Sequence, residues 1–243
     1  MQSQKQHERV FSFEFFPPKN EDAALKLREV RNTLAQLNPR FFSVTFGAGG
    51  STRDRTLETV LEIQKAGSQA APHLSCIASS RTELRELLDA YQQHGIRHIV
   101  ALRGDLPEGD STPGDLPHAR DLVAFIRAET GDHFHIEVAA YPEFHPEARD
   151  SAADLQHFKR KVEAGADSAM TQYFYSPDAY YRFVDSCEKL GITLPIVPGI
   201  MPITNYTQLA RFSDRCGAEI PRWIRRRLEA FGDDAESLRA FGL

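Results

Sequence analysis

Two periods of hydrophobic and polar positions alternate along the chain. Short runs rich in apolar and β-branched residues begin near Phe11, Phe41, Ala71, His98, His135, Ser168 and Pro195. Between them lie longer segments in which apolar residues recur every three or four positions, as on one face of an amphipathic helix. The pattern therefore predicts seven strands that alternate with helices.

The predicted helices carry both an apolar stripe and an end signal. The stripes of the first three are Leu27, Val30, Leu34 and Leu37, then Leu57, Val60 and Leu61, then Leu84, Leu87, Leu88 and Tyr91. Glycines that suit a left-handed C-cap end several helices, namely Gly67, Gly95, Gly165 and Gly191. Beyond Ile220 the sequence predicts two short helices separated by Gly232.

Strands and helices that alternate in this way form a parallel sheet, either doubly wound or closed into a barrel. A doubly wound sheet usually carries G-x-G-x-x-G after its first strand, but here that strand ends in Phe16, Pro17 and Pro18. The glycines at 47–50 have Thr52 in place of the third small residue. Residues able to do chemistry follow many different strands instead, which favours a TIM-type (βα)8 barrel in the α/β class.

Seven βα units are visible in this pattern and the eighth strand is apparently missing. We expect a single barrel domain over residues 1–243 that is short at its C-terminus. Such a barrel would be truncated from a longer chain or closed by another molecule, because unpaired strand edges pair readily.

Composition narrows the class of protein. The 243 residues are 41% hydrophobic and 26% charged, which is ordinary globular usage and excludes a disordered or fibrous chain. The net charge of -5 argues against a protein built mainly to hold nucleic acid or anionic lipid. No apolar run reaches the roughly 18 residues of a membrane span. Three distant cysteines form neither a disulfide framework nor a metal knuckle. These features favour a cytoplasmic protein.

Glu14 is the sharpest candidate for chemistry. Alternation along the first strand sends Phe13 and Phe15 to one face and Ser12 and Glu14 to the other. If the phenylalanines pack under helices, Glu14 points into the barrel. A carboxyl in aromatic surroundings has a raised pKa, as a general acid near neutrality requires. The alternative is a structural glutamate paired with a buried cation.

Other candidates have open alternatives. Arg103, Gly104 and Asp105 end the fourth strand as a ligand contact or as a salt bridge at the barrel mouth. The loop at 47–50 is either a flexible connection or a phosphate site before a helix capped by Ser51 or Thr52.

Two histidines and one polar stripe of a helix also allow both a functional and a structural interpretation. His73 and His145 lack the spacing of a metal site, so we expect no metal. Asp154, His157 and Lys161 share one stripe of a helix, and the pattern alone favours a solvated polar face.

Several blocks, in order from about residue 9 to 238, resemble bacterial methylenetetrahydrofolate reductase of the short form without a regulatory domain. They are residues 12–18 (SFEFFPP), 43–45 (SVT), 53–56 (RDRT), 71–74 (APHL), 101–105 (ALRGD), 139–143 (AAYPE), 171–174 (TQYF) and 198–202 (PGIMP).

The resemblance implies a flavoprotein on a βα barrel, with FAD bound at the strand tops. Such an enzyme reduces 5,10-methylenetetrahydrofolate to 5-methyltetrahydrofolate and supplies methyl groups for methionine. NADH or NADPH reduces the flavin, with NADH favoured, and folate then takes the same flavin face. The resemblance also implies a cytoplasmic protein, with small-molecule substrates, no nucleic acid or membrane partner, and a homo-oligomeric state.

Site residues follow from the same resemblance. Glu14 would be the general acid that opens the folate ring, Asp105 would lie near the flavin and the pterin, Gln172 would bind the pterin, and Tyr206 would stack on folate or nicotinamide. The residues implied to bind FAD are Thr45, Phe46, Ala48, His73, Arg103, Gly104, Asp105, Tyr141, His145, Ala148, Asp154, His157, Arg160 and Lys161.

Two other interpretations stay open at this point. A remnant could bind flavin or folate without turnover, because its barrel lacks a strand. A βα-barrel lyase or aldolase without flavin is weakened by the lack of a Schiff-base lysine on any strand.

Overall fold

The computed structural model describes residues 1–46, 50–105, 114–232 and 234–242. The chain divides into two compact units. The N-terminal unit is formed by Glu8–Val138 and Glu163–Asp167, and the C-terminal unit by Met1–His7, Ala139–Val162 and Ser168–Leu243. Each unit is described by itself.

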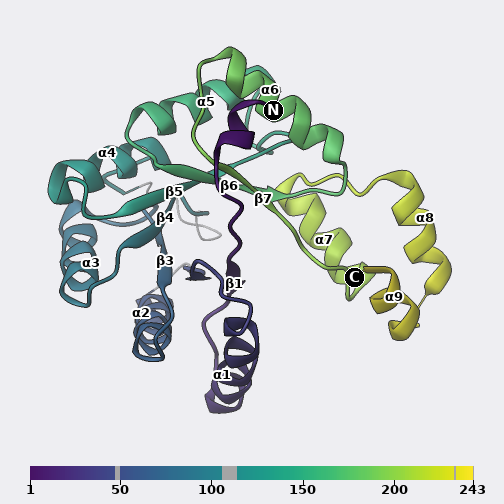
Figure 1. Ribbon diagram of the computed structural model, residues 1–243, viewed down its shortest axis with the longest axis horizontal. Helices are drawn as coiled ribbons and strands as arrows, with labels where there is room; N and C mark the ends of the chain where they lie inside the picture. The colour runs from purple at the N-terminus through teal and green to yellow at the C-terminus, as the bar shows by residue number, and fades with distance from the viewer. Residues whose placement is uncertain (47–49, 106–113, 233, 243) are drawn as a thin grey trace. The chain divides into compact units, whose positions relative to one another are not determined.

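The N-terminal unit is built from parallel strands that are hydrogen-bonded in chain order (Figure 1). The strands are β1 (Phe13–Phe15), β2 (Phe42–Val44), β3 (Ala70–Ser75), β4 (His98–Leu102) and β5 (His135–Ala140). The last two residues of β5 belong to the C-terminal unit. The connecting helices are α1 (Glu21–Ala35), α2 (Gly50–Lys65), α3 (Arg81–Gln93) and α4 (Ala119–Thr130).

The pairing register divides this sheet into an apolar and a polar face. Phe13 and Phe15 both stack on Phe42, with ring centroids 6.0 and 5.2 Å apart. That apolar face continues with buried aliphatic residues, and the helices α2 and α4 contact its strands. The opposite face, here called the polar face, carries Glu14, Ser43, Thr45, His73, Ser75, His98, His135 and Glu137. The predicted alternation around Glu14 is confirmed.

Helix ends in this unit follow the sequence signals. Asn20 caps α1 by accepting from Ala23 N at 2.9 Å. Ser80 and Glu83 form a reciprocal capping box at the start of α3. The predicted glycines 67, 95 and 165 have positive φ in this unit, and so does Gly191 in the C-terminal unit. The expected cap at Ser51 or Thr52 is wrong, because α2 already begins at Gly50 and both residues lie in its first turn.

The C-terminal unit contains the remaining two strands, β6 (Ser168–Tyr173) and β7 (Ile196–Gly199), which pair in parallel. Its helices are the short 3-10 helix η1 (Ser3–Gln6), α5 (Ser151–Glu163), α6 (Pro177–Lys189), α7 (Tyr206–Cys216), α8 (Arg222–Phe231) and α9 (Ala235–Gly242). The seven predicted strands are therefore all present in the described residues, and the α/β class with its strand–helix alternation is confirmed.

The tail after Ile220 forms the two short helices that the sequence predicts. Gly232 ends α8 with a φ of 54°. Ile224, Leu228 and Leu238 bury their side chains against Leu209 of α7, so the tail shares one apolar cluster with that helix. This cluster extends to Tyr173 at the end of β6.

The predicted burial of the first helical stripe is wrong in part. Val30 is 41% exposed, and Leu37, which lies beyond the end of α1, is 56% exposed. Arg31 is the buried residue of this helix, and it joins Arg28 in ion pairs to Glu62 of α2. Periodicity identified the helix but could not show which side of it is covered. No helix within the described ranges is long and apolar enough to cross a membrane.

Two histidines pack against each other at the start of β4 and β5. The His98 ring stacks on the Phe41 ring, with centroids 5.2 Å apart, and its centroid lies 4.9 Å from that of the His135 ring. The Nδ1 atom of His98 is buried and has no hydrogen-bond partner in the part of the chain that the structure describes. Burial, reinforced by the neighbouring His135 and Arg40, lowers the pKa of His98 to about 4. Burial also lowers the pKa of His135, although Asp167 opposes this shift.

We therefore expect the free energy of unfolding to fall as the pH drops from about 6.5 toward 4. In that window the unfolded histidines bind protons that the folded pair does not, so protonation favours unfolding. Urea midpoints measured across this range should fall less steeply for His98→Phe. A His94→Gln variant, which changes an exposed histidine, is the control. Equal slopes for wild type and His98→Phe would contradict the expectation.

Candidate functional site

Glu14 lies on the polar face of the N-terminal unit, between two other polar side chains. It is in register with Ser43 on β2. Its Oε2 atom lies 3.4 Å from Nε2 of His73 on β3. Strand alternation places all three side chains on the same face, because register partners in a parallel sheet point the same way.

The electrostatics of this group suit a proton donor beside a neutral base. The Glu14 side chain is 47% exposed, yet desolvation raises the pKa of its carboxyl. Both observations hold for a group that solvent reaches from one side while protein surrounds the others. His73 is buried, and that burial lowers its pKa to about 4, so its imidazole is neutral at pH 7.

The segment after β4 contains the predicted Arg103, Gly104 and Asp105. Gly104 has a φ of +85°, and a Cβ at this position would lie 2.0 Å from Ser75 Oγ. Ser75 Oγ donates to the Arg103 carbonyl at 2.7 Å, and Ile77 N donates to the same oxygen at 2.8 Å. Glycine is therefore required by close backbone approach. Asp105 is exposed at the end of this segment.

Of the predicted residues after β2, the structure describes Thr45 and Phe46. Thr45 N donates to Phe15 O at 2.9 Å, and Thr45 O accepts from the buried Thr56 hydroxyl at 2.9 Å. These bonds fix Thr45 and the half-buried Phe46 at the end of β2. Ala48 and the glycine-rich loop around it lie outside the described residues.

In the C-terminal unit, the segment after β5 gathers another set of predicted residues. The ring of His145 packs edge-on against Tyr141 at 4.6 Å. Its Nδ1 atom accepts from Glu147 N at 3.1 Å. Asp154 Oδ2 accepts from His145 N at 3.1 Å, which ties α5 to the segment before it. Ala148 N donates to His145 O at 2.9 Å.

Lys161 is half-buried at the inner side of α5. Its Nζ donates to Ala139 O at 2.5 Å and lies 5.6 Å from the Phe158 ring. Burial lowers the pKa of Lys161 to about 8, while Asp154 acts in the opposite direction. The solvated-face interpretation is thus wrong for Lys161. It holds for His157, which is exposed, as is Arg160.

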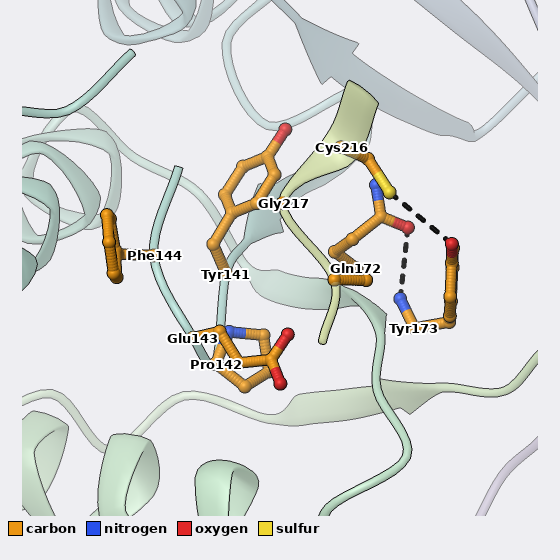
Figure 2. Close-up of a pocket in the computed structure, with 9 residues that line it drawn as sticks. Tyr141, Pro142, Glu143, Phe144, Gln172, Tyr173, Cys216 and Gly217 are labelled. Atoms are coloured by element: carbon orange, nitrogen blue, oxygen red, sulfur yellow. Dashed lines mark hydrogen bonds between the residues drawn. The ribbon is translucent and has the colours of Figure 1, made fainter. Parts of the chain in front are cut away.

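Gln172 lines a small pocket in the same unit (Figure 2). The pocket encloses about 160 Å³ of space without protein atoms, part of it open to solvent. It is lined by Tyr141, Pro142, Glu143, Phe144, Gln172, Tyr173, Cys216, Gly217 and Ala218. Tyr141 and Gln172, both predicted, therefore meet in one pocket.

The sequence did not single out several groups of this pocket as site residues. Glu143 Oε2 accepts from Glu219 N at 2.8 Å, and burial raises the pKa of its carboxyl. Gln172 Oε1 accepts from Tyr173 N at 3.0 Å. The Tyr173 hydroxyl accepts from Cys216 Sγ at 3.5 Å (Figure 2). The same hydroxyl lies 2.8 Å from Ser213 Oγ. The position of Glu143 after the fifth strand was the available signal.

Tyr206 begins α7 and is not part of the pocket lining. It packs against the apolar cluster of the tail helices. Its hydroxyl donates to Glu229 Oε1 on α8 at 3.5 Å. The predicted residues thus fall into a Glu14–His73 group and an Arg103–Asp105 segment in one unit, and a Tyr141–Lys161 group, the pocket and Tyr206 in the other.

In the part of the chain that the structure describes, no cluster of three or more His, Cys, Asp or Glu side chains could hold a metal ion. The chemistry available from these residues is proton transfer at Glu14, cation contacts at Arg103 and Lys161, and amide hydrogen bonding at Gln172.

Comparison with known proteins gives one consistent match. The family model for methylenetetrahydrofolate reductase matches residues 1–243. The chain is 46% identical over 232 residues to the 5,10-methylenetetrahydrofolate reductase of Salmonella typhimurium, covering 95% of this chain and 77% of that protein. It is 40% identical over 253 residues to methylenetetrahydrofolate reductase (NADH) 1 of Arabidopsis thaliana, covering 98% of this chain and 43% of that protein.

A solved structure shows the same fold. It is an uncharacterized protein from Clostridium thermocellum that binds two copies of 5-methyl-5,6,7,8-tetrahydrofolic acid. The TM-score is 0.65 at 15% sequence identity, with 99% of this chain and 83% of that chain covered. The TIM-like α/β class predicted from the sequence is confirmed.

Proposed function

Because the chain belongs to the methylenetetrahydrofolate reductase family, an oxidoreductase family of folate one-carbon metabolism, we propose how its residues carry out that reduction. Glu14 donates the proton that opens the five-membered ring of 5,10-methylenetetrahydrofolate. FAD is the bound cofactor, and NADH supplies the electrons. The enzyme works in the cytoplasm as a homo-oligomer.

One observation carries the role of Glu14. Its carboxyl is reachable by solvent, and hence by a substrate, yet desolvation raises its pKa toward the working range of a general acid. A salt-bridged structural glutamate would show the opposite shift. The nearest described basic side chain, His73, is itself held neutral by burial.

The residues implied to bind FAD fit a dinucleotide by their chemistry. The set contains the cations Arg103, Arg160 and Lys161, and such side chains complement phosphate groups. Gly104 lacks a side chain where the backbone must pass close to Ser75. Tyr141 and His145 offer ring surfaces. FAD, when bound, supplies the hydride that reduces the substrate.

The chain's own residues then bind, orient and protonate. Glu14 holds its proton at a carboxyl oxygen and delivers it to the substrate nitrogen. Gln172 would hydrogen-bond the pterin through its side-chain NH2, since its Oε1 already accepts from Tyr173 N. Asp105, exposed at the end of its segment, would orient the pterin and, as a negative charge, oppose charge build-up on the reduced cofactor. Tyr206 would stack on the folate or the nicotinamide.

The use of NADH is proposed from the resemblance and from the name of the Arabidopsis thaliana relative, methylenetetrahydrofolate reductase (NADH) 1. Steady-state rates with NADH and NADPH at equal concentrations test it. A rate with NADPH that equals or exceeds the rate with NADH would contradict this preference.

We expect purified protein to carry FAD noncovalently and to be yellow. Heating should release the flavin into the supernatant, where its absorbance and mass identify it as FAD. A colourless preparation that FAD cannot reconstitute would overturn the cofactor proposal.

A further inference from the structure

Two buried polar atoms beside Glu14 lack a hydrogen-bond partner among the described residues. They are the hydroxyl oxygen of Ser43 and the Nε2 atom of His73. Ser43 is 1% exposed and His73 6% exposed. A buried polar group without a partner costs free energy, so such groups in a native structure call for an explanation.

The pairing geometry places Ser43 beside Glu14 and His73 near its carboxyl. Ser43 is the register partner of Glu14 on the adjacent strand, and adjacent strands are about 4.8 Å apart. His73 Nε2 lies 3.4 Å from Glu14 Oε2. Such contacts are often long before substrate binds and tighten in the reacting complex.

We propose that Ser43 and His73 are positioning residues for Glu14, whose hydroxyl and Nε2–H groups hydrogen-bond the carboxylate that forms when Glu14 gives up its proton. This inference rests on the proposed role of Glu14 as the acid. The Glu14 O–H bond breaks and an N–H bond forms on the folate nitrogen. The negative charge stays on the Glu14 carboxylate, where the two donors stabilise it.

The neutral state of His73 fits this role. A neutral imidazole with its proton on Nε2 is a donor at that atom and keeps no positive charge. Burial holds the pKa of His73 at about 4, so the ring neither competes for the proton of Glu14 nor adds a charge at neutral pH.

Few charged groups of the described N-terminal unit lie on the polar face near Glu14 and His73. On the polar face, β2 contributes Ser43 next to Glu14 and β4 contributes Val100 next to His73, and neither titrates. Glu137 on β5 lies in the row of His73, one strand beyond Val100. Arg103 and Asp105 follow β4. The ion pairs of Arg28 and Arg31 with Glu62 join the helices α1 and α2.

The test separates the two half-reactions of the holoenzyme by stopped flow. Ser43→Ala and His73→Phe should each slow the folate-dependent step at pH 7 by about 10-fold. Hydrogen bonds to the carboxylate form lower the pKa of a carboxyl group. Their loss should therefore move the alkaline limb of the pH–rate profile of the folate-dependent step to higher pH. For Ser43→Ala, the NADH-dependent step should change less than about twofold.

Matched variants separate positioning from packing. Ser43→Thr keeps the hydroxyl and suits a strand. It should therefore restore the rate of the folate-dependent step and the pH of its alkaline limb. Thr59→Ala removes a buried hydroxyl that bonds within α2, to Arg55 O, and should leave both steps unchanged. FAD affinity is measured for each variant, because the resemblance also places His73 at the flavin.

Several results would overturn the inference. One is an unmoved alkaline limb in both Ser43→Ala and His73→Phe. Another is an equal slowing of both half-reactions in Ser43→Ala, which would mean that Ser43 only supports the fold. If Glu14→Gln itself leaves the folate-dependent step unchanged, the proposed role of Glu14 fails instead, so the two failures are distinguishable.

Discussion

Glu14→Gln is expected to slow the folate-dependent half-reaction by about 100-fold or more, the scale of lost general-acid catalysis. The amide keeps the size of the side chain and its place on β1, but it has no proton to give to the folate nitrogen. The NADH-dependent half-reaction needs no such proton and should keep its rate. Stopped-flow traces of flavin absorbance, with NADH and with folate in separate experiments, measure the two steps.

A matched variant tests whether the loss depends on the place of Glu14 or follows from any Glu→Gln change in this unit. Glu8 lies in the same unit, outside any strand, and is exposed, so Glu8→Gln should leave both half-reactions unchanged. Equal slowing of both steps in Glu14→Gln would show that Glu14 holds the sheet together and is not the acid.

The face on which Glu14 lies could be predicted from the sequence, because strand alternation depends only on neighbouring residues. The partners of Glu14 could not. Ser43 meets it through the register of β1 and β2, which is set after a connection that includes the whole of α1. His73 reaches it from β3, the second strand along. Local patterns carry no information on pairing across such distances.

Lys161 and Gln172 show the same limit at the level of single side chains. The helical stripe of Lys161 is polar, which predicts a solvated face, yet its ammonium group donates to the Ala139 carbonyl. Gln172 lies at an irregularity in the β6–β7 pairing, where its side chain turns back onto the next backbone N–H. Neither orientation follows from periodicity, because both depend on which backbone atoms the fold brings close.

The family resemblance adds residue roles that periodicity does not, and the structure then separates these residues by environment. His157 and Arg160 are exposed on α5, whereas Lys161 is half-buried on the same helix. Among the residues implied to bind FAD on this helix, Lys161 therefore has the environment in which a charge contact is strongest. Contacts made by His157 and Arg160 would be weaker and screened by salt.

Gly104 is the residue of the candidate site whose substitution should cost the most stability. Its φ of +85° is strained for an L-residue, and an added Cβ would lie 2.0 Å from Ser75 Oγ and 2.9 Å from Ile77 Cγ2. Ser75 cannot turn away without losing its 2.7 Å hydrogen bond to Arg103 O. Strain and overlap act together, so the backbone after β4 must shift.

We expect Gly104→Ala to lower the free energy of unfolding by about 3 kcal/mol, which corresponds to a Tm roughly 6–12 °C lower for a chain of this size. Gly67→Ala is the matched control, since Gly67 has a φ of +86° but no atom within 4 Å of an added Cβ. It should cost about 1 kcal/mol, the strain alone. Calorimetry or urea unfolding measures both variants, and FAD titration should show weaker binding only in Gly104→Ala. Equal losses in the two variants would contradict the close approach of Gly104 to Ser75.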